Sequence, residues 1–508
     1  MATAAAQITG LDRLLVIGMG RSGTAAALAA RRLLPGADII LADQQRGIMP
    51  PETQQELLAH GIRLEPGRED SSLLDGCSLV IKSPGVPVGI SLLVEARGRG
   101  IRVWGELEFA WRHLPQLMVG VTGTNGKTTT TELIGHILKG AGRACRVAGN
   151  VGTALSSLVG VAGEDEILVV ELSSFQLEDS EKLRPDIAVL LNLTEDHLDR
   201  HPDAAHYFGA KMQIFANQSP ADLAIINQDD PNCRAGIPGA GQRIWFSREA
   251  LAAVQPLVYA QGGIIYARQA ELGRAVDQLR RRLPGGGHGL QSGAATGSGR
   301  NGPAGGEVPT EAENSGPQAT HPTEVIAWSE ASLIGEHNLE NSLAACAVGL
   351  ALGLAPEEIA AGLKSFPGVR HRLQEVRRVN GVRYINDSKA TNVDAAVKAL
   401  TAFKGGIHLI LGGSLTGCSF DGPAAAAAVD RVREVILIGE AATEIEASFW
   451  RQGRRTVMAG DLQTAVKLAS GRVVDGDVVL LAPACASYDQ YDNYEQRGEH
   501  FISLVNKL

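Results

Sequence analysis

Cysteine is scarce in this sequence: there are six cysteines in 508 residues, and no two of them form a Cys-x-x-Cys pair. This scatter excludes a disulfide framework and a thiolate zinc site, and it predicts reduced thiols in a cytoplasmic protein. Long apolar runs are missing too, since no stretch approaches the roughly 20 residues that a membrane-spanning helix needs. The first ten residues show no signal-peptide pattern. A basic surplus is also absent, and at a formal net charge of −9 we expect no nucleic acid partner.

What the chain has is length and a regular alternation of apolar strands with helical stretches. A chain of 508 residues exceeds what one core can organise and predicts about three domains. The alternation is typical of parallel sheets with crossover helices, so the predicted fold class is α/β. We expect a Rossmann-like domain over residues 1–115, a central P-loop ATPase-like domain over 116–365, and a second Rossmann-like domain over 366–508. Residues 284–322 are rich in Gly, Ser, Pro and Ala, which predicts a disordered surface insertion.

The most informative segment is Val121–Thr130, which follows a short apolar run and precedes a helical pattern. A strand, a Gly-rich turn, Lys-Thr and a helix are the build of a phosphate-cradling loop. Glycines let backbone N–H groups turn toward an anion, and the helix N-terminus adds positive potential. Lys127 would pair with the outer phosphates, and the Thr128 hydroxyl would hold Mg²⁺. The strict pattern has Gly where Val121 stands. The segment predicts a nucleoside triphosphate site formed by Gly123, Thr124, Asn125, Gly126, Lys127, Thr128, Thr129 and Thr130.

A second glycine pattern lies near the start of the chain. Gly18, Gly20 and Gly23 follow the first apolar strand, and Asp43 ends the next one. This is the dinucleotide fingerprint, with glycines for close approach and an acid for ribose hydroxyls. Alone it would indicate NAD, and a tight strand-to-helix turn is the plain structural alternative. Beside a phosphate loop it favours a second nucleotide of another kind.

Polar side chains follow two consecutive buried strands of the central region. Glu171 ends the strand 167–171, and the segment Asn192–Asp199, which contains His197, lies at the end of the strand 187–192. A carboxylate at the carboxyl end of a strand, next to a phosphate loop, is a natural partner of Mg²⁺. His197 could hold a second metal ion or orient a reacting group. For any one of these residues, a solvated turn is the alternative.

Further polar groups stand in the later part of the chain. Lys211 has apolar and aromatic neighbours in the sequence, so it is either partly buried or a snorkelling surface lysine. Asn338 and Asn341, three residues apart at a helix start, could reach one ligand or cap the helix. The runs Asn386–Asn392 and Pro483–Gln490 each follow a strand, where open α/β sheets bind ligands. Neither run alone identifies a substrate.

Together these segments resemble the Mur ligases, the ATP-dependent amide-forming enzymes of peptidoglycan synthesis. The resemblance covers nearly the whole chain except the insertion, and it is carried by Gly123–Thr128, Glu171–Glu178, Thr194–Arg200, Asn386–Asn392 and Pro483–Ser487. It is greatest to the members that add D-glutamate to UDP-N-acetylmuramoyl-L-alanine. It implies a cytoplasmic monomer with no membrane partner. In the implied reaction, ATP converts the substrate carboxylate to an acyl phosphate, which the amine of D-glutamate then attacks.

The resemblance also implies roles for single residues. The catalytic residues would be Lys127, Glu171, His197 and Lys211. The ligands of two Mg²⁺ ions would be Thr128, Glu171, His197 and Lys211, the last as a carbamate formed with CO₂. ATP would also contact Asn338, Asn341, Arg372, Asp387 and Lys389. The UDP substrate would contact Gly18, Gly20, Arg21, Ser22, Gly23, Asp43, Ser83, Asn150, Ser173 and Gln176. D-glutamate would contact Thr391, Thr416, Ser487 and Tyr494.

One departure and two alternatives remain open. The D-glutamate-adding members usually carry a lysine where Thr416 stands, and an uncharged hydroxyl predicts a weaker grip on the glutamate carboxylate unless another cation reaches it. One alternative is another Mur or folylpolyglutamate-type amide ligase. The glycine pattern of the first domain argues against the folate enzyme, and Asn386–Asn392 argues against the alanine-adding member. The other alternative is an NAD-dependent dehydrogenase with an incidental phosphate loop.

Overall fold

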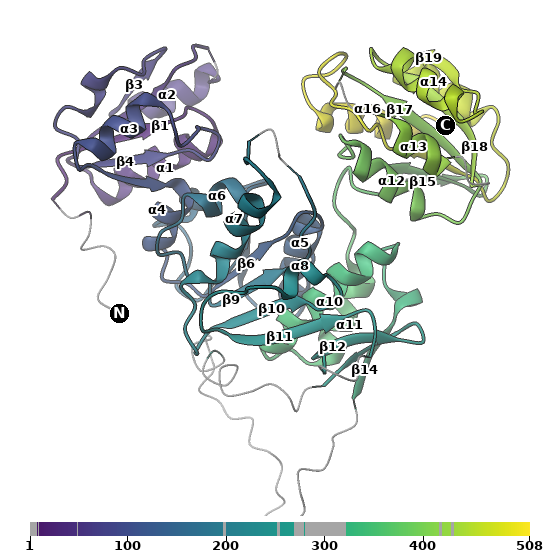
Figure 1. Ribbon diagram of the computed structural model, residues 1–508, viewed down its shortest axis with the longest axis horizontal. Coiled ribbons are helices and arrows are strands. Elements are labelled where there is room, and N and C mark those ends of the chain that lie inside the picture. The colour runs from purple at the N-terminus through teal and green to yellow at the C-terminus, as the bar shows by residue number, and fades with distance from the viewer. Residues whose placement is uncertain are drawn as a thin grey trace, which may run out of the picture. The chain divides into compact units, whose positions relative to one another are not determined.

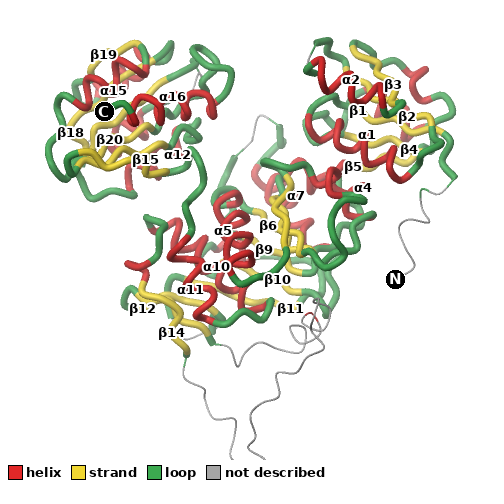
Figure 2. Tube along the Cα trace, turned by 180° about the vertical axis from the view of Figure 1, so that it is seen from behind, coloured by secondary structure: helices red, strands yellow, loops and turns green. Residues whose placement is uncertain are grey.

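The chain is built around three mainly parallel β-sheets with helices packed against them, as Figures 1 and 2 show. They are seen in a computed structural model that describes residues 8, 10–47, 49–196, 200–250, 255–268, 279, 322–415, 419–427 and 431–508. The predicted fold class is thereby confirmed. The chain divides into two compact units, one formed by Met1–Ala331 with Glu340–Lys364, the other by Ser332–Leu339 with Ser365–Leu508.

The first sheet, purple to blue in Figure 1, has five parallel strands in the order β3-β2-β1-β4-β5. Its strands are β1 (Arg13–Ile17), β2 (Asp38–Asp43), β3 (Ile62–Pro66), β4 (Leu79–Lys82) and β5 (Arg102–Gly105). Its helices are α1 (Arg21–Leu33), α2 (Pro51–Ala59), η2 (Ser71–Leu74), α3 (Ser91–Gly98) and α4 (Glu106–Arg112). The strand order reverses at β1, which places a ligand crevice at the carboxyl ends of β1 and β4.

The second sheet has nine strands in the order β14-β13-β12-β11-β10-β9-β6-β8-β7. The strands from β7 to β12 in this order are parallel, and β13 and β14 are antiparallel additions at one edge. The strands are β6 (Met118–Thr122), β7 (Cys145–Gly149), β8 (Ile167–Glu171), β9 (Ile187–Leu190), β10 (Leu223–Asn227), β11 (Gln242–Ser247), β12 (Val258–Gln261), β13 (Ile264–Ala267) and β14 (Thr323–Ala327).

Helices cover the second sheet and join it to the first. They are α5 (Lys127–Gly140), η3 (Leu155–Leu158), α6 (Ser174–Glu178), α7 (Ala204–Ala216), α8 (Pro231–Arg234), η5 (Trp328–Glu330), α10 (Glu336–Ala351) and α11 (Pro356–Ser365). One continuous apolar core contains Leu14 of β1, Leu155 of η3 and Leu168 of β8. The Arg32 side chain donates to the carbonyl of Val159, 2.9 Å away, beside η3. The first two sheets therefore belong to one unit.

The third sheet, green to yellow in Figure 1, has six strands in the order β15-β16-β20-β17-β18-β19, all parallel except the edge strand β15. Its strands are β15 (Gln374–Val379), β16 (Val382–Asn386), β17 (Ile407–Gly412), β18 (Val432–Ile438), β19 (Val457–Gly460) and β20 (Val478–Leu481). Its helices are α12 (Val393–Thr401), α13 (Asp421–Ala427), α14 (Ala442–Arg451), α15 (Leu462–Ser470) and α16 (Tyr494–Asn506). Apolar clusters lie on both faces of this sheet.

Candidate active site

The phosphate loop connects β6 to α5 and depends on two glycines. Gly126 precedes α5 with φ 87°, and a Cβ there would lie 2.2 Å from Oδ1 of Asn341. Gly123 has φ 153°, and a Cβ there would lie 3.0 Å from Cβ of Leu191. Both positions therefore need glycine. The loop leads directly into the N-terminus of α5, whose free backbone N–H groups and dipole favour an anion.

The loop is held by the segment that follows β9. The backbone carbonyl of Asn192 accepts from N of Thr124 at 2.9 Å, and its side-chain Oδ1 accepts from N of Asn125 at 2.8 Å. The Thr124 hydroxyl donates to the carbonyl of Thr194 at 2.9 Å. Asn192 begins the predicted polar segment 192–199, but the sequence assigned it no role of its own.

Two lysines meet at one loop carbonyl. Nζ of Lys127 donates to the carbonyls of Gly123 and Thr124, at 2.9 and 2.8 Å, and Nζ of Lys211 donates to the same Gly123 carbonyl at 2.8 Å. Lys211 is buried in α7, with its ammonium 4.6 Å from the ring centroid of Tyr207. Burial, followed by the charge of Lys127, lowers the pKa of Lys211 well below its usual range. The geometry favours an uncharged amine at Lys211.

Glu171 ends β8 beside this loop and is buried. Its carboxylate accepts from Nδ2 of Asn150 at 3.1 Å, and its backbone carbonyl accepts from N of Asn150 at 2.9 Å. The carbonyl of Asn150 in turn accepts from Nη2 of Arg21 in α1 at 3.0 Å. Asn150 therefore connects the buried carboxylate of the second sheet with the first sheet.

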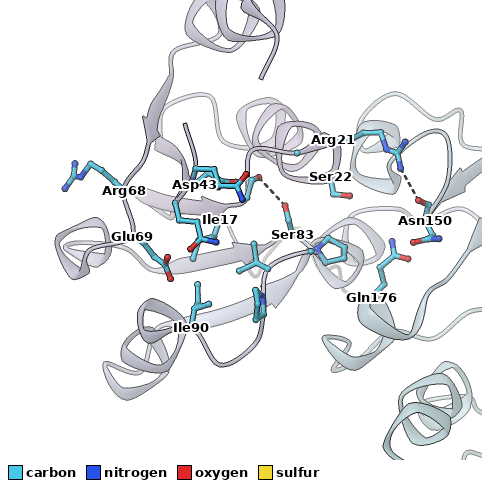
Figure 3. Close-up of a pocket in the computed structure, with 18 residues that line it drawn as sticks. Ile17, Arg21, Ser22, Asp43, Arg68, Glu69, Ser83, Ile90, Asn150 and Gln176 are labelled. Carbon is cyan, nitrogen blue, oxygen red and sulfur yellow. Dashed lines mark hydrogen bonds between the residues drawn. The ribbon is translucent and has the colours of Figure 1, made fainter. Parts of the chain in front are cut away.

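A pocket of about 530 Å³ lies at the carboxyl ends of β1 and β4 (Figure 3). Eight predicted UDP-substrate residues line it: Gly18, Gly20, Arg21, Ser22, Asp43, Ser83, Asn150 and Gln176. The Asp43 carboxylate accepts from N of Met19 at 2.8 Å, and the Ser83 hydroxyl donates to the Gly18 carbonyl at 3.2 Å. These bonds fix the pocket wall.

Two other residues predicted to bind the UDP substrate do not line this pocket. Gly23 lies in α1, where a Cβ would overlap the Gly18 carbonyl oxygen, so its local role is close packing of helix on strand. Ser173 precedes α6 and forms a capping box with Gln176, the Ser173 hydroxyl accepting from N of Gln176 at 3.3 Å.

The two asparagines of α10 belong to different units. Oδ1 of Asn341 accepts from the Thr130 hydroxyl at 3.2 Å, so this side chain backs the phosphate loop. Nδ2 of Asn338 donates to the carbonyl of Ile334 at 2.7 Å within the other unit. Asn341 is thereby placed at the phosphate loop.

In the third sheet, most of the predicted residues follow β16 and β20, and Arg372 lies just before the antiparallel β15. Asp387 is buried, and burial raises its pKa to about 6 although Arg372 opposes the shift. Nζ of Lys389 lies 5.5 Å from the ring centroid of Tyr494, and Ser487 is buried in the loop after β20. Thr391 is half-buried. These side chains therefore lie at one edge of the sheet, where its parallel strands end. They are those of Arg372, Asp387, Lys389, Thr391, Ser487 and Tyr494.

A buried arginine that was not predicted fastens the loops at this edge. Arg497 of α16 is 1% exposed and donates to the carbonyls of Ser388, Cys485, Ala486 and Gly412, at 3.0, 3.1, 3.3 and 3.4 Å. Burial lowers its pKa to about 10. In the sequence it stands among polar residues and looks like a surface cation.

Several predictions lie outside the described residues: His197, Thr416 and all but the last residue of the predicted insertion 284–322. His197 as a metal ligand and Thr416 as a glutamate contact stay predictions. Among the helices that the structure describes, none is long and apolar enough to cross a membrane.

Comparison with known proteins places this arrangement among relatives. The model of the Mur ligase middle domain matches residues 121–267, and that of the Mur ligase glutamate ligase domain matches residues 371–485. The UDP-N-acetylmuramoylalanine–D-glutamate ligase of Koribacter versatilis is 39% identical over 98% of this chain and 97% of its own length. The corresponding ligase of Acidobacterium capsulatum is 40% identical over 97% of this chain and 96% of its own length.

Solved structures share the fold at low sequence identity. The UDP-N-acetylmuramate-alanine ligase MurC of Thermotoga maritima aligns with a TM-score of 0.54 and 18% identity, over 97% of this chain and 99% of that one. The MurF ligase of Thermotoga maritima, solved in complex with ADP, also gives a TM-score of 0.54 and 18% identity, over 92% and 95% of the two chains. Both support the three-domain α/β architecture.

Proposed function

The chain belongs to the Mur ligase family of ATP-dependent, amide-bond-forming ligases, and from this premise we propose that it joins D-glutamate to UDP-N-acetylmuramoyl-L-alanine. The relatives with this name match nearly the whole chain, which supports the choice of substrates. One observation carries the proposal: a phosphate loop, the buried Glu171 and a Lys211 of lowered pKa lie together at the carboxyl edge of the second sheet. This set suits phosphoryl transfer to a carboxylate. Because the chain belongs to this ligase family, the alternative of an NAD-dependent dehydrogenase is excluded.

ATP would lie in the phosphate loop, with its phosphates on the backbone N–H groups of Gly123–Thr130. Lys127 would clamp the γ-phosphate, since its ammonium group lies over the loop on two carbonyls that a phosphate could replace as partners. Asn341 supports the loop from α10 through Thr130. Asn338 is proposed to contact the adenine side together with Asn341.

The residues proposed for Mg²⁺ fit a hard cation by their chemistry. Thr128 offers a hydroxyl in the first turn of α5, and Glu171 offers a buried carboxylate. Lys211 fits only after loss of its charge, and its lowered pKa favours the neutral amine. That amine can take up CO₂ with release of one proton, giving a carbamate with anionic oxygens. Bound Mg²⁺ would neutralise charge on the transferred phosphoryl group. His197 is proposed as a further ligand.

The pocket of the first sheet would hold the UDP part of the substrate. Its glycines allow the backbone of Gly18–Gly23 to approach a diphosphate, and Asp43 lies at the strand end where ribose hydroxyls are bound in such folds. Asn150 and Gln176 form the part of the wall that comes from the second sheet. This wall is continuous with Glu171 through the Asn150 side chain. The muramoyl-alanine end of the substrate could therefore extend toward the phosphate loop.

The third sheet would bind the amino acid. Arg372, Asp387 and Lys389 are proposed as ATP contacts. Thr391, Thr416, Ser487 and Tyr494 are proposed as D-glutamate contacts. The cationic Lys389 and Arg372 lie at the same sheet edge as Ser487, which suits anionic ligands.

The reaction then follows from the placement of charge. The carboxylate of the UDP substrate attacks the γ-phosphorus, ADP leaves, and Lys127 stabilises the transferred charge. The amine of D-glutamate attacks the acyl carbon, phosphate leaves, and the amine loses a proton. Water must be kept out while the acyl phosphate exists.

Phosphate release tests the proposal. Release from ATP is measured with UDP-N-acetylmuramoyl-L-alanine and, in turn, D-glutamate, L-glutamate, L-alanine and a diamino acid. We expect turnover with D-glutamate alone, and none when the UDP substrate is omitted. Equal turnover with L-glutamate or L-alanine would contradict the assignment and favour another amide ligase of the superfamily.

A further inference from the structure

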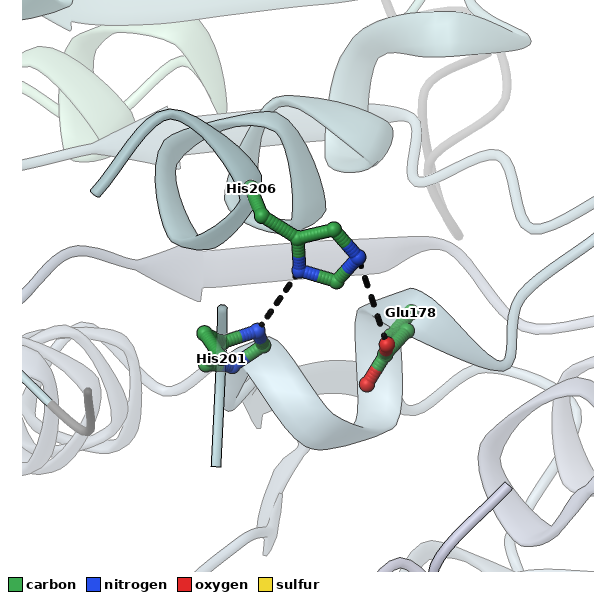
Figure 4. Close-up of side chains that lie close together, drawn as sticks. All are labelled: Glu178, His201 and His206. Carbon is green, nitrogen blue, oxygen red and sulfur yellow. Dashed lines mark hydrogen bonds and ion pairs between the residues drawn. The ribbon is translucent and has the colours of Figure 1, made fainter. Parts of the chain in front are cut away.

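Glu178, His201 and His206 form a cluster that the proposed reaction does not use (Figure 4). Each offers a ligand atom, and the three atoms lie within 4.8 Å of one another. Glu178 ends α6, His206 is in the first turn of α7, and His201 lies just before α7. The side chain of His201 is buried, while those of Glu178 and His206 are 23% and 45% exposed. One buried ligand and two accessible ones leave an entry path for an ion.

We propose that these three side chains bind one divalent transition cation of the Zn²⁺ type. Two imidazoles and one carboxylate are typical ligands for Zn²⁺, whereas Mg²⁺ prefers oxygen ligands alone. With three protein ligands the cation keeps one position for water or an exogenous ligand. The site is therefore chemically distinct from the oxygen-rich surroundings of Thr128 and Glu171.

The side chains can converge on a cation when the His206 ring turns, because its two nitrogens now face different partners (Figure 4). Nδ1 of His201 lies 3.0 Å from Nδ1 of His206, and Nε2 of His206 lies 3.7 Å from Oε1 of Glu178. In a tetrahedral zinc site with bonds of 2.0–2.1 Å, ligand atoms stand about 3.3 Å apart. With Nδ1 of His206 as its ligand atom, the exposed His206 side chain rotates and the partly buried Glu178 carboxylate moves toward the ion. The cation then replaces the proton shared by the two imidazoles.

The buried ligand is already oriented for this role. Nε2 of His201 lies 3.0 Å from the Ser174 hydroxyl, and the His201 ring stacks on Phe175 with centroids 5.4 Å apart and an interplanar angle of 12°. When Nε2–H donates to the Ser174 oxygen, the lone pair of Nδ1 faces the cluster. Metal-ligating histidines commonly have such a partner on the second nitrogen.

A cation here would tie the end of α6 to the start of α7. Gln176 of α6 lines the nucleotide pocket, and α7 carries Lys211. The bound ion would therefore hold two segments of the proposed active site together. Cation binding requires none of the residues assigned to the ligase reaction, so it can be tested independently of the substrates.

Equilibrium dialysis of the full-length protein against micromolar Zn²⁺ in millimolar Mg²⁺ tests the site. We expect the wild-type protein to bind one equivalent of Zn²⁺ more than His206→Gln or Glu178→Gln. His60→Gln, which changes an exposed histidine, is the matched control and should bind as the wild type does. Ser174→Ala should weaken Zn²⁺ binding by about 10–100-fold, the usual cost of losing such a partner.

Co²⁺ gives a spectroscopic signature for the same site. The wild-type protein should show the strong visible absorption of four-coordinate Co²⁺, and His206→Gln should lose it while its near-UV circular dichroism and metal-free melting curve stay those of the wild type. Equal Zn²⁺ uptake by the wild type and by both folded ligand variants would overturn the proposal. So would loss of the extra equivalent in His60→Gln.

Discussion

The phosphate loop and the loops at the carboxyl edge of the third sheet build tight turns with different residues. At the phosphate loop, the positive-φ positions are Gly123 and Gly126, at 153° and 87°. At the third sheet, glycines such as Gly412 and Gly413, at 120° and 149°, are joined by three non-glycine residues: His371, Leu373 and Ala484, at 61°, 42° and 61°. Glycine adopts this conformation freely, whereas a Cβ in the left-handed region costs about 1–2 kcal/mol per residue.

The difference lies in what holds each loop in place. The phosphate loop is fixed by residues of the neighbouring segment, chiefly Asn192, and its glycines add no strain. In the third sheet, Arg497 of α16 binds the carbonyls of Cys485 and Ala486 beside the strained Ala484, while N of Leu373 donates to the Asp387 carboxylate. Glycine adopts the turns of the phosphate loop without strain, whereas the left-handed Ala484 needs surrounding contacts to hold it in place.

The largest expected effect comes from the buried lysine beside the phosphate loop. Lys211→Arg keeps a cation that cannot lose its charge or form a carbamate, so phosphate release should fall by about 10³-fold, the upper end of what removal of one preorganised group costs. Lys139→Arg, at the exposed end of α5, is the control. Lys211→Ala should recover part of its activity when short carboxylic acids are added. Full activity of Lys211→Arg would refute the carbamate.

The phosphate loop itself should tolerate no Cβ. In Gly126→Ala, the new Cβ would lie 2.2 Å from Oδ1 of Asn341 at a φ of 87°, so the loop must shift. A displacement of this kind should reduce phosphate release by about 10²-fold. Gly140→Ala is the control, because nothing lies within 4 Å of a Cβ there. Wild-type turnover of Gly126→Ala, with the same melting temperature, would show that the loop is not fixed by its glycines.

The buried acid of the third sheet predicts a pH-dependent stability. The pKa of Asp387 is raised to about 6, above its ordinary value of 3.8. The folded state therefore binds the proton more tightly, and this contribution is full below pH 4 and lost as the pH rises through 6. Asp387→Asn is always neutral, so it should slow hydrogen exchange of the β16 amides at pH 7 by about 10-fold or more. The upper bound is set by the shift of roughly two pKa units, at about 1.4 kcal/mol of unfolding free energy per unit.

At pH 4 the exchange rates of Asp387→Asn and the wild type should converge. Asp492→Asn, an exposed acid of the same unit, is the control and should match the wild type at both pH values. A constant ratio between Asp387→Asn and the wild type across this range would show that the carboxylate is not strained by burial.

The same contrast explains how far the sequence could predict the molecule. The fold class followed from the apolar periodicity, and the phosphate loop was visible because glycines mark its turns. The backbone of His371 and Leu373 carries no such mark, and the burial of Arg497 depends on carbonyls far away in the chain. Ser173 illustrates a further limit: its motif predicts a substrate contact, and the structure reveals a helix cap formed with Gln176, which does not test that contact. Side chains that act through distant backbone groups leave no local pattern.

The smallest effect is expected where strain can simply be removed. Ala484 has φ 61°, and Ala484→Gly would relieve about 1–2 kcal/mol of left-handed strain. Loss of one buried methyl group and the greater freedom of the unfolded chain cost about 0.8 and 0.4–1 kcal/mol in the opposite direction. The free energy of opening measured by hydrogen exchange of the β20 amides should therefore change by less than about 1 kcal/mol. The rate of phosphate release should stay within about twofold of the wild type. Ala484→Val, with a β-branched side chain at the same φ, should be clearly destabilised. If Ala484→Gly instead loses most of its activity, the strain itself positions Ser487, and the third sheet depends on its non-glycine residue as strictly as the phosphate loop depends on Gly126.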